Sequence, residues 1–424
     1  MKKNYKKTIL KNGLRIITIP EKETQAATVL VLVATGSKYE TKDISGISHF
    51  LEHMLFKGTE KSKTPMDVAE VLDKIGGDYN AFTGEEYTGY YAKVDASHFD
   101  QALGWVSDIF LNSKLPAKEM EKERGVIIEE IKMYEDNPMR HIEQVWKELL
   151  YGDQPAGWDI AGTRETIKKM QRTDILKYIN SQYVAKNTVI CVAGNIKEKI
   201  VIEKIKKQFA RIQTSEFKPK PKVAESQKEP QIKLSYKDIG QTHIALGVRA
   251  YNMFHSERFA LQLLAVILGG MMSSRMFDQI REKLGAAYYV RTYYDSDTDT
   301  GYLATFAGVD NAKLEKVIEA VLKEYKKIKD KKVGADELKK AKDYIKGKTV
   351  LGLESSDALA SFYGSQELLR KEILTPEQIF KEIDKVTATD IQKIAKDIFT
   401  PEKLNLAIIS KLKDEKQFKK LLKI

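Results

Sequence analysis

The 424-residue sequence has a single cysteine and lacks any long hydrophobic run. One cysteine allows no intramolecular disulfide, which suits a reducing compartment. Cys191 lies in an apolar run at residues 189–193, which predicts a buried thiol on a strand. A membrane-spanning helix needs roughly 20 apolar residues, and no signal-type apolar segment follows the charged N-terminus. The sequence therefore predicts a soluble, cytoplasmic protein with no membrane partner.

The sequence also lacks the features of a nucleic-acid-binding protein. Its 71 Lys+Arg residues exceed its 60 Asp+Glu residues and give a modest net charge of +11. Nucleic-acid binding usually requires a concentrated basic patch on a recognisable module. No such module is found, and lysine-rich stretches such as residues 323–332 are better explained as solvated helix faces. We therefore expect no nucleic-acid partner.

Prolines are few, ten in total, and several of them gather with lysines at residues 214–231. This composition favours an extended, solvated backbone. It predicts a linker between an N-terminal half, residues 1–213, and a C-terminal half, residues 232–424.

The two halves resemble each other near their ends. Residues 167–196 and 383–412 align at a constant offset, and each begins a helix with a Thr-Asp pair before a break and an apolar strand. Thr173 and Thr389 are the expected N-caps. A helix start alone would be unremarkable, but the shared order of elements indicates an internal duplication.

Strands and helices mix in both halves without a strict βαβ rhythm, and glycine-rich nucleotide-binding loops are absent. Apolar β-branched runs predict strands, and apolar residues spaced by three and four predict helices. The class that fits is α+β, with sheets covered on one face by helices. We expect strands at residues 28–34, 87–94, 242–248, 285–294 and 301–309, and helices at residues 47–56, 66–75, 99–111, 118–135, 257–268 and 312–329.

The pentapeptide His49-Phe50-Leu51-Glu52-His53 carries the clearest chemical signal. Residues i and i+4 of a helix lie on the same face, so both imidazoles can reach one ion. Zinc is well matched by imidazole nitrogen and carboxylate oxygen, and it lowers the pKa of a bound water. Glu52 borders the same face, where a carboxylate can act as general base. A lone histidine would more often be structural, but two histidines on an otherwise apolar helix favour a metal site.

A zinc site of this kind needs a third protein ligand. The helix predicted at residues 118–135 is rich in acids, and most of them should be solvated. Glu123 and Glu130 share one helical face, whereas Glu129 points elsewhere, roughly 100° around the helix. Spacing alone leaves both Glu123 and Glu130 open as the ligand.

These residues give the sequence a specific resemblance. Residues 46–59, around the H-x-x-E-H motif, and residues 123–130 resemble the two motif regions of the inverzincin metallopeptidases of the M16 group. Within that group the sequence is similar to the single-site bacterial relatives of the mitochondrial processing peptidase. The resemblance extends over essentially the whole chain, is strongest at residues 12–134 and is looser beyond.

The resemblance implies a Zn²⁺ site with His49, His53 and Glu130 as ligands, Glu52 as general base and Glu123 as a supporting acid. It also implies two similar α+β halves that close like a clamshell on a peptide, with the C-terminal half inactive. The helix predicted at residues 257–268 indeed has no metal-binding pair. Relatives further suggest a homodimer, or a heterodimer with a related chain.

Substrate contacts are also implied by the resemblance. The strand with Asn80, Ala81 and Phe82 is similar to the family strand that lies along the substrate backbone, where a peptide adds by main-chain hydrogen bonds. A hairpin entry would explain the preceding Gly-Gly pair equally well. Many relatives supply an Arg and a Tyr from the second half to the reacting carbonyl; Arg291 and Tyr293 are the nearby candidates, although a strand surface explains them as well.

The sequence therefore predicts a zinc endopeptidase or oligopeptidase that acts on unfolded or short peptides. The alternative is a peptide-binding or assembly subunit that keeps the fold without turnover. Such subunits usually have an eroded motif, whereas His49, Glu52, His53 and Glu130 are all present.

Overall fold

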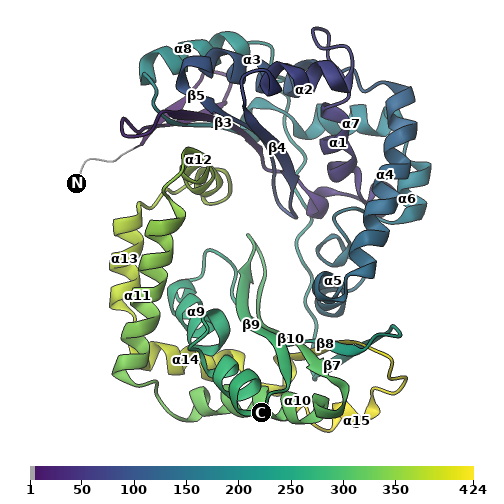
Figure 1. The fold of residues 1–424 in the computed structure, drawn as a ribbon, viewed down its shortest axis with the longest axis vertical. Helices are drawn as coiled ribbons and strands as arrows, with labels where there is room; N and C mark the ends of the chain where they lie inside the picture. Colours follow the sequence, from purple (N-terminus) through teal and green to yellow (C-terminus); the bar gives the residue numbers. More distant parts are fainter. Residues whose placement is uncertain (1–4) are drawn as a thin grey trace. The chain divides into compact units, whose positions relative to one another are not determined.

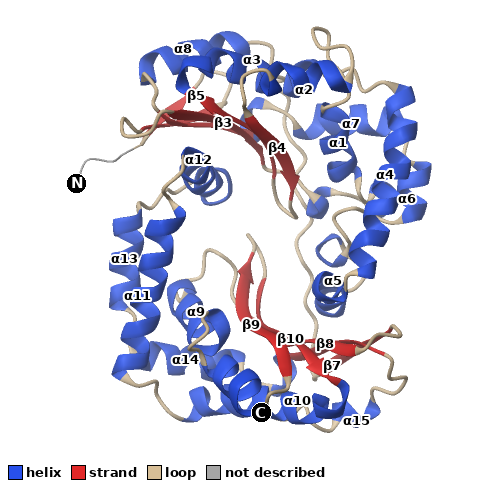
Figure 2. Cartoon of the chain, in the orientation of Figure 1, coloured by secondary structure: helices blue, strands red, loops and turns tan. Residues whose placement is uncertain are grey.

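The computed structural model describes residues 5–424, which form two compact units of mixed helices and strands (Figure 1). The predicted α+β class is confirmed, as the colouring by secondary structure makes plain (Figure 2). The first unit combines Met1–Lys132 with Asp159–Pro221 and Val350–Thr375, and the second combines Met133–Trp158 with Lys222–Thr349 and Pro376–Ile424. The chain passes between the units at Pro221, inside the predicted linker. The units differ from the predicted halves because two segments belong to the unit of the other half.

The first unit is built on a six-stranded sheet with the order β1-β2-β6-β3-β5-β4. Strands β2 and β6 are parallel, and the other neighbours are antiparallel. Because β4 pairs with β5 alone, it forms an open edge. The strands are β1 (Lys6–Ile9), β2 (Arg15–Pro20), β3 (Ala26–Val33), β4 (Asp78–Thr83), β5 (Thr88–Asp95) and β6 (Thr188–Gly194). The helices are α1 (Ile47–Leu55), α2 (Pro65–Asp73), α3 (Phe99–Asn112), α4 (Ala117–Asp136, which ends in the second unit), α6 (Arg164–Lys169), α7 (Arg172–Gln182), α8 (Glu198–Gln208) and α12 (Ser356–Ser365).

Both faces of this sheet are buried, which differs from the one-sided cover expected from the sequence. Val29 and Val31 of β3 face a core shared with α1, α3 and α8. Leu30 and Leu32 face the opposite way, toward Tyr363 of α12. Cys191 lies on this second face as a buried free thiol, as predicted. The second cover comes from the C-terminal part of the sequence, and no local pattern identifies α12 as that cover.

The second unit repeats this plan with a five-stranded sheet of the order β7-β11-β8-β10-β9. Its strands are β7 (Gln231–Tyr236), β8 (Gln241–Arg249), β9 (Ala287–Ser296), β10 (Gly301–Asp310) and β11 (Leu404–Ser410). One face packs on helices of the C-terminal half, and the other on α5 (Pro138–Tyr151) through Trp146. The remaining helices are α9 (Arg258–Ala265), α10 (Leu314–Asp330), α11 (Ala335–Gly352, whose end lies in the first unit), α13 (Pro376–Lys385), α14 (Ala388–Ile398) and α15 (Lys416–Lys419).

The two sheets have matching connectivity. Each contains one parallel pair, β2 with β6 and β7 with β11, and the following strands are antiparallel in the same order. This agreement supports the internal duplication. The predicted N-caps were wrong by two residues: Gln171 and Thr387 are the N-caps of α7 and α14, and the aspartates of both Thr-Asp pairs are N3 residues of capping boxes.

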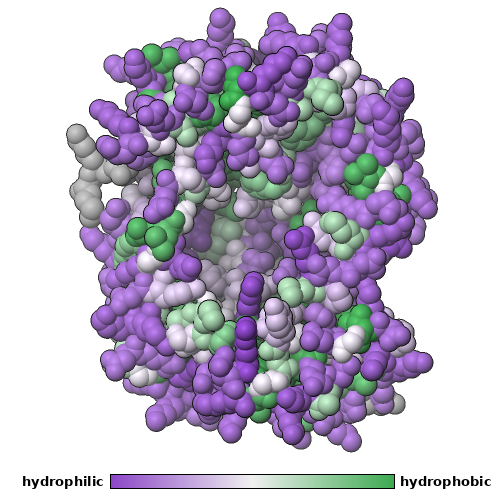
Figure 3. Space-filling view, viewed as in Figure 1, coloured by the Kyte–Doolittle hydropathy of each residue, from purple (hydrophilic) through white to green (hydrophobic). Residues whose placement is uncertain are grey.

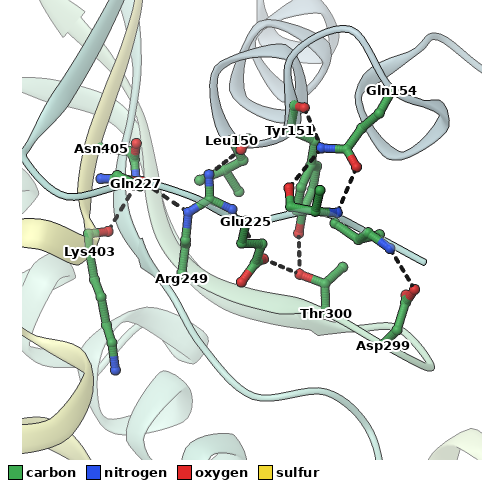
Figure 4. A network of polar contacts seen from close by, with 12 residues as sticks. Leu150, Tyr151, Gln154, Glu225, Gln227, Arg249, Asp299, Thr300, Lys403 and Asn405 are labelled. Carbon is green, nitrogen blue, oxygen red and sulfur yellow. Dashed lines mark hydrogen bonds and ion pairs between the residues drawn. The ribbon is translucent and has the colours of Figure 1, made fainter.

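The segment predicted as a solvated linker is held to both units by hydrogen bonds. On the first unit, the Lys218 backbone N–H donates to the Ser181 carbonyl at 3.3 Å. On the second unit, Gln154 makes two 2.9 Å hydrogen bonds with the backbone of Ala224, and Gln227 accepts from Arg249 at 2.9 Å (Figure 4). Next to Pro221, Lys220 forms an ion pair with Glu86 of the first unit at 3.3 Å.

The surface is predominantly hydrophilic on the face shown in Figure 3, with hydrophobic residues scattered among polar ones. Among the described helices, none combines the length and the apolar composition that crossing a bilayer would take. Isolated exposed apolar residues are normal for a folded protein.

Candidate metal centre

Helix α1 begins at a strained, tightly packed point. Gly46 precedes it with φ of 92°, and a Cβ there would lie 2.6 Å from the Ala161 carbonyl oxygen. The buried Glu40 carboxylate accepts hydrogen bonds from the backbone N–H groups of Gly46 at 2.7 Å and Ser48 at 2.9 Å. It therefore satisfies donors at the helix start that have no partner within the helix. This fixes the direction of α1 and with it the side chains one turn further on.

The amphipathic pattern of α1 aims its two histidines away from the core. Phe50, Leu51 and Met54 are fully buried against the sheet. The side chains of His49 and His53 retain 12% and 19% of their exposure. Their ring centroids lie 4.6 Å apart. One turn of helix thus places two imidazoles side by side at the surface of the unit, as the motif predicts.

Glu130 of α4 completes a group of three possible metal ligands. Its Oε2 lies 3.5 Å from Nε2 of His49 and 3.5 Å from Nε2 of His53. Two ligand atoms about 2.1 Å from one tetrahedral zinc ion lie roughly 3.4 Å apart. The three side chains therefore fit zinc in both donor chemistry and spacing. In the described part of the chain, no other three histidine, cysteine or acidic side chains bring their ligand atoms within 4.8 Å of one another.

Glu123 holds a different position from Glu130, although both lie on one face of α4. Its Oε2 lies 3.0 Å from Nδ1 of His53, and its Oε1 lies 2.8 Å from Nζ of Lys57. It thus contacts the imidazole nitrogen that faces away from the metal position. Acids in this place orient a ligating histidine and select its tautomer. Glu129 is exposed and pairs with Lys132.

The charges around the two histidines shift their pKa values in opposite directions. Burial lowers the pKa of His53, but hydrogen bonds to Glu123 and Glu130 outweigh burial and raise it to about 9. Burial and the neighbouring His53 lower the pKa of His49 to about 4. These shifts favour a charged His53 with a proton on both ring nitrogens in the metal-free site at neutral pH, and a metal ion has to displace the proton on Nε2.

Glu52 lies beside the ligands without being one of them. Its Oε2 accepts a hydrogen bond of 2.5 Å from the Thr83 hydroxyl of β4. Burial raises the pKa of Glu52, and the hydrogen bond from Thr83 opposes that shift. A carboxylate with a raised pKa beside a metal position is placed to accept and return a proton.

The structure places Asn80, Ala81 and Phe82 on the open edge strand β4. The Ala81 backbone N–H donates to the Asn80 side-chain oxygen at 2.8 Å. Phe82 packs against Tyr87 on the α12 face of the sheet. The glycines before β4 close the end of α2: the Gly76 N–H donates to the Asp73 carbonyl, and φ of Gly76 is 65°.

The two arginine and tyrosine candidates of the second unit lie on β9. Tyr293 stacks on Phe306 with ring centroids 4.7 Å apart, and its hydroxyl donates to Glu143 at 3.0 Å. Arg291 lies two residues before Tyr293 on β9 and is exposed. The Tyr293 hydroxyl is thus already engaged within its own unit, which favours the strand-surface interpretation.

Two residues close to the site were not singled out from the sequence. Lys57 follows His53 by four residues, a spacing that would place both on one side of a continuous helix, although α1 itself ends at Leu55. Thr83 follows Ala81 by two residues and therefore shares its face of β4. Both signals are present in the sequence, but each becomes specific only when the neighbouring element is known.

Comparisons with known proteins agree with this arrangement. The family model described as insulinase (peptidase family M16) matches residues 15–164, and the model described as the peptidase M16 inactive domain matches residues 169–345. A Bacillus subtilis protein described as the uncharacterized zinc protease YmxG is 36% identical over 96% of this chain and 98% of its own length. A Mycobacterium leprae protein, also described as an uncharacterized zinc protease, is 32% identical over 99% of this chain and 94% of its own.

Solved structures confirm the fold. A protease from Helicobacter pylori has a TM-score of 0.90 at 24% identity and covers 96% of this chain and 99% of that one. A peptidase M16 inactive domain from Pseudomonas fluorescens has a TM-score of 0.89 at 16% identity, covering 97% and 100%. From the family models and the extent of the similarity, we conclude that the chain belongs to peptidase family M16.

Proposed function

We propose that this protein is a zinc-dependent endopeptidase or oligopeptidase that hydrolyses unfolded or short peptides. The observation that carries the proposal is the convergence of His49, His53 and Glu130 at zinc-ligand spacing, with the Glu52 carboxylate beside them. A binding subunit without turnover has no need for a general base next to a metal position. Relatives described as zinc proteases add support.

In this proposal each side chain has a separate task. His49, His53 and Glu130 hold the ion, which when bound supplies a Lewis acid and lowers the pKa of water. Glu52 accepts the proton of the attacking water and later delivers a proton to the leaving amine. Glu123 holds Nδ1 of His53, so that Nε2 is directed at the ion.

The substrate would bind as an added strand along β4. An open edge offers backbone donors and acceptors to an extended peptide, and such recognition depends on main-chain geometry more than on side chains. The Ala81 N–H, now satisfied by Asn80, is one donor that a peptide carbonyl can take over. This mode would select unfolded chains because a folded substrate cannot present a free strand. We propose that the protein works in the cytoplasm as a homodimer or beside a related chain.

The decisive experiment combines metal analysis with cleavage of a quenched fluorescent peptide. Purified protein should contain about one zinc per chain and cleave the peptide, and a chelator should stop cleavage. Glu52→Gln should retain zinc and lose activity by about two to four orders of magnitude. Peptide binding without turnover, unchanged by chelator, would instead support the assembly-subunit alternative. Activity that persists in Glu52→Gln would remove Glu52 from its role.

A further inference from the structure

The hydrogen bond between Thr83 and Glu52 joins two parts of the site that the sequence does not connect. Thr83 is the last residue of β4, and Glu52 lies within α1. The hydroxyl donates to Oε2 at 2.5 Å and leaves Oε1 outside the interaction. A hydrogen bond that a hydroxyl donates to an ionised carboxylate is stronger than one between neutral groups. It holds one oxygen of the carboxylate and thereby sets the direction of the other.

The position of the Thr83 hydroxyl is set by the strand and the turn that follows. Thr83 pairs with Thr88 of β5, and the Gly84 N–H donates to the Tyr87 carbonyl at 2.9 Å. Alternation along β4 places Thr83 on the same face as Ala81, which packs on the core that contains α1. Phe82 packs on the opposite face. The donor therefore sits on a paired strand, where its backbone has little freedom to move away from Glu52.

This geometry couples the open edge to the proposed base. A peptide that pairs with β4 aligns on the strand whose last side chain holds Glu52. The same backbone would thus set both the register of the peptide and the direction of the carboxylate. Reactions of bound groups are sensitive to such alignment, and a misplacement of about 1 Å can cost roughly 100-fold in rate.

We propose that Thr83 is a positioning residue that orients the Glu52 carboxylate and links it to the peptide-binding edge of β4. The inference rests on the proposed peptidase function and deepens it. Thr83 touches neither the metal ligands nor the reacting bond in this assignment. Its contribution is to keep Oε1 of Glu52 directed at the water that Glu52 deprotonates.

The test compares four variants of the full-length, zinc-loaded protein. Thr83→Val removes the hydroxyl and preserves the shape, Thr83→Ala serves if the valine variant fails to fold, and Thr83→Ser restores the hydroxyl. The matched control is Ser97→Ala, which removes another hydrogen bond of 2.5 Å from a hydroxyl to a carboxylate, that of Asp95 at the end of β5, without touching Glu52 or β4. Kinetics with a quenched peptide, zinc affinity by chelator competition and a crystal structure of each variant are measured.

The expected result is a fall in kcat of about 10- to 100-fold in Thr83→Val or Thr83→Ala, with KM and zinc affinity within about two-fold. Thr83→Ser should recover most of kcat, and Ser97→Ala should match the wild type. The crystal structure of Thr83→Val should show the Glu52 carboxylate turned from its wild-type direction.

Three outcomes would overturn the inference while the proposed function stands, as shown by an active wild type and an inactive Glu52→Gln variant. These are wild-type kcat in Thr83→Val, failure of Thr83→Ser to recover activity, and an equal loss in Ser97→Ala. A wild type that holds zinc and cleaves no peptide would refute the proposed function, and this inference with it.

Discussion

At the scale of single residues, two glutamates of α4 share a helical face but contact different nitrogens of the histidines. Glu130 converges on both histidines, and Glu123 contacts the far nitrogen of His53. The sequence could place both acids on the correct face but could not rank them, because the choice depends on how α4 crosses α1. The resemblance to M16 peptidases selected Glu130, and the geometry supports that selection.

Glu130→Gln should weaken zinc binding by at least about 100-fold, because it replaces an anionic ligand by a neutral amide. Glu129→Gln is the matched control: its carboxylate is exposed and paired with Lys132. Chelator competition measures both affinities. A larger loss in the Glu129 variant would contradict the assignment of the ligands.

Lys57→Met should lower zinc affinity by about 10-fold. The ammonium lies 2.8 Å from Glu123, and without it Glu123 is less firmly held against His53. Changes to groups that support a ligand typically cost 10- to 100-fold in affinity. Lys132→Met, which loses only an exposed pair with Glu129, should leave the affinity unchanged. Equal affinities in both variants would show that Lys57 does not support the site.

At the scale of secondary-structure elements, the start of α1 depends on a buried acid. Burial raises the pKa of Glu40 to about 8, although the N–H groups of Ser48 and Gly46 oppose the shift. An unfolded glutamate titrates near 4.5. Between these values the folded state keeps a proton that the unfolded state has lost. The contribution of Glu40 to the free energy of unfolding should therefore fall as pH rises from about 4.5 to 8.

Glu40→Gln provides the measurement, since glutamine cannot titrate. Urea unfolding of metal-free wild type and variant at several pH values from 5 to 8 should show a steeper loss of stability with rising pH in the wild type. Titration of His53 is common to both proteins and cancels in the difference. Parallel curves would mean that Glu40 has an ordinary pKa.

The contact of α12 with the first sheet leaves little room for a methyl group, so neighbouring side chains would have to shift. A Cβ at Gly364 would lie 2.9 Å from Leu32 Cδ1 and 3.2 Å from Cys191 Cβ. Gly364→Ala should therefore lower the free energy of unfolding by about 1–3 kcal/mol through overpacking. Gly104→Ala in α3, where a Cβ meets nothing within 4 Å, should raise it by up to about 1 kcal/mol. Thermal unfolding of both variants tests the opposite signs.

Local pattern predicted most strands and helices but not their packing partners. The apolar run of β6 is buried at every position, which is typical of a strand covered on both faces. The sequence therefore contained a signal for a second cover on the sheet. It could not name α12 as that cover, because a contact between Gly364 and Cys191 is set by the fold of the whole chain.

At the scale of the whole molecule, the segment predicted as a linker is hydrogen-bonded to the first unit before Pro221 and to the second unit after it. The Val223 N–H donates to Asp299 at 3.0 Å, and the Ala224 N–H donates to Gln154 at 2.9 Å. Both amides should be protected from hydrogen exchange by at least about 10-fold relative to an unstructured chain, unlike those of a solvated tether. Asp299→Ala should remove protection at Val223 more than at Ala224. If both amides of the wild type exchange at the random-coil rate, this prediction is wrong and the segment is a flexible linker.

The exchange of α5 and α12 between the sequence halves has a consequence for how the gene can be divided. A fragment ending at Pro221 would encode the metal ligands but not the helix that covers Leu30, Leu32 and Cys191. The complementary fragment would likewise lack Trp146 against its own sheet. Each fragment alone would expose an apolar sheet face and aggregate, whereas on co-expression each fragment could supply the helix that the other lacks. The two sequence halves therefore depend on each other, and neither can fold alone when the chain is divided at the linker.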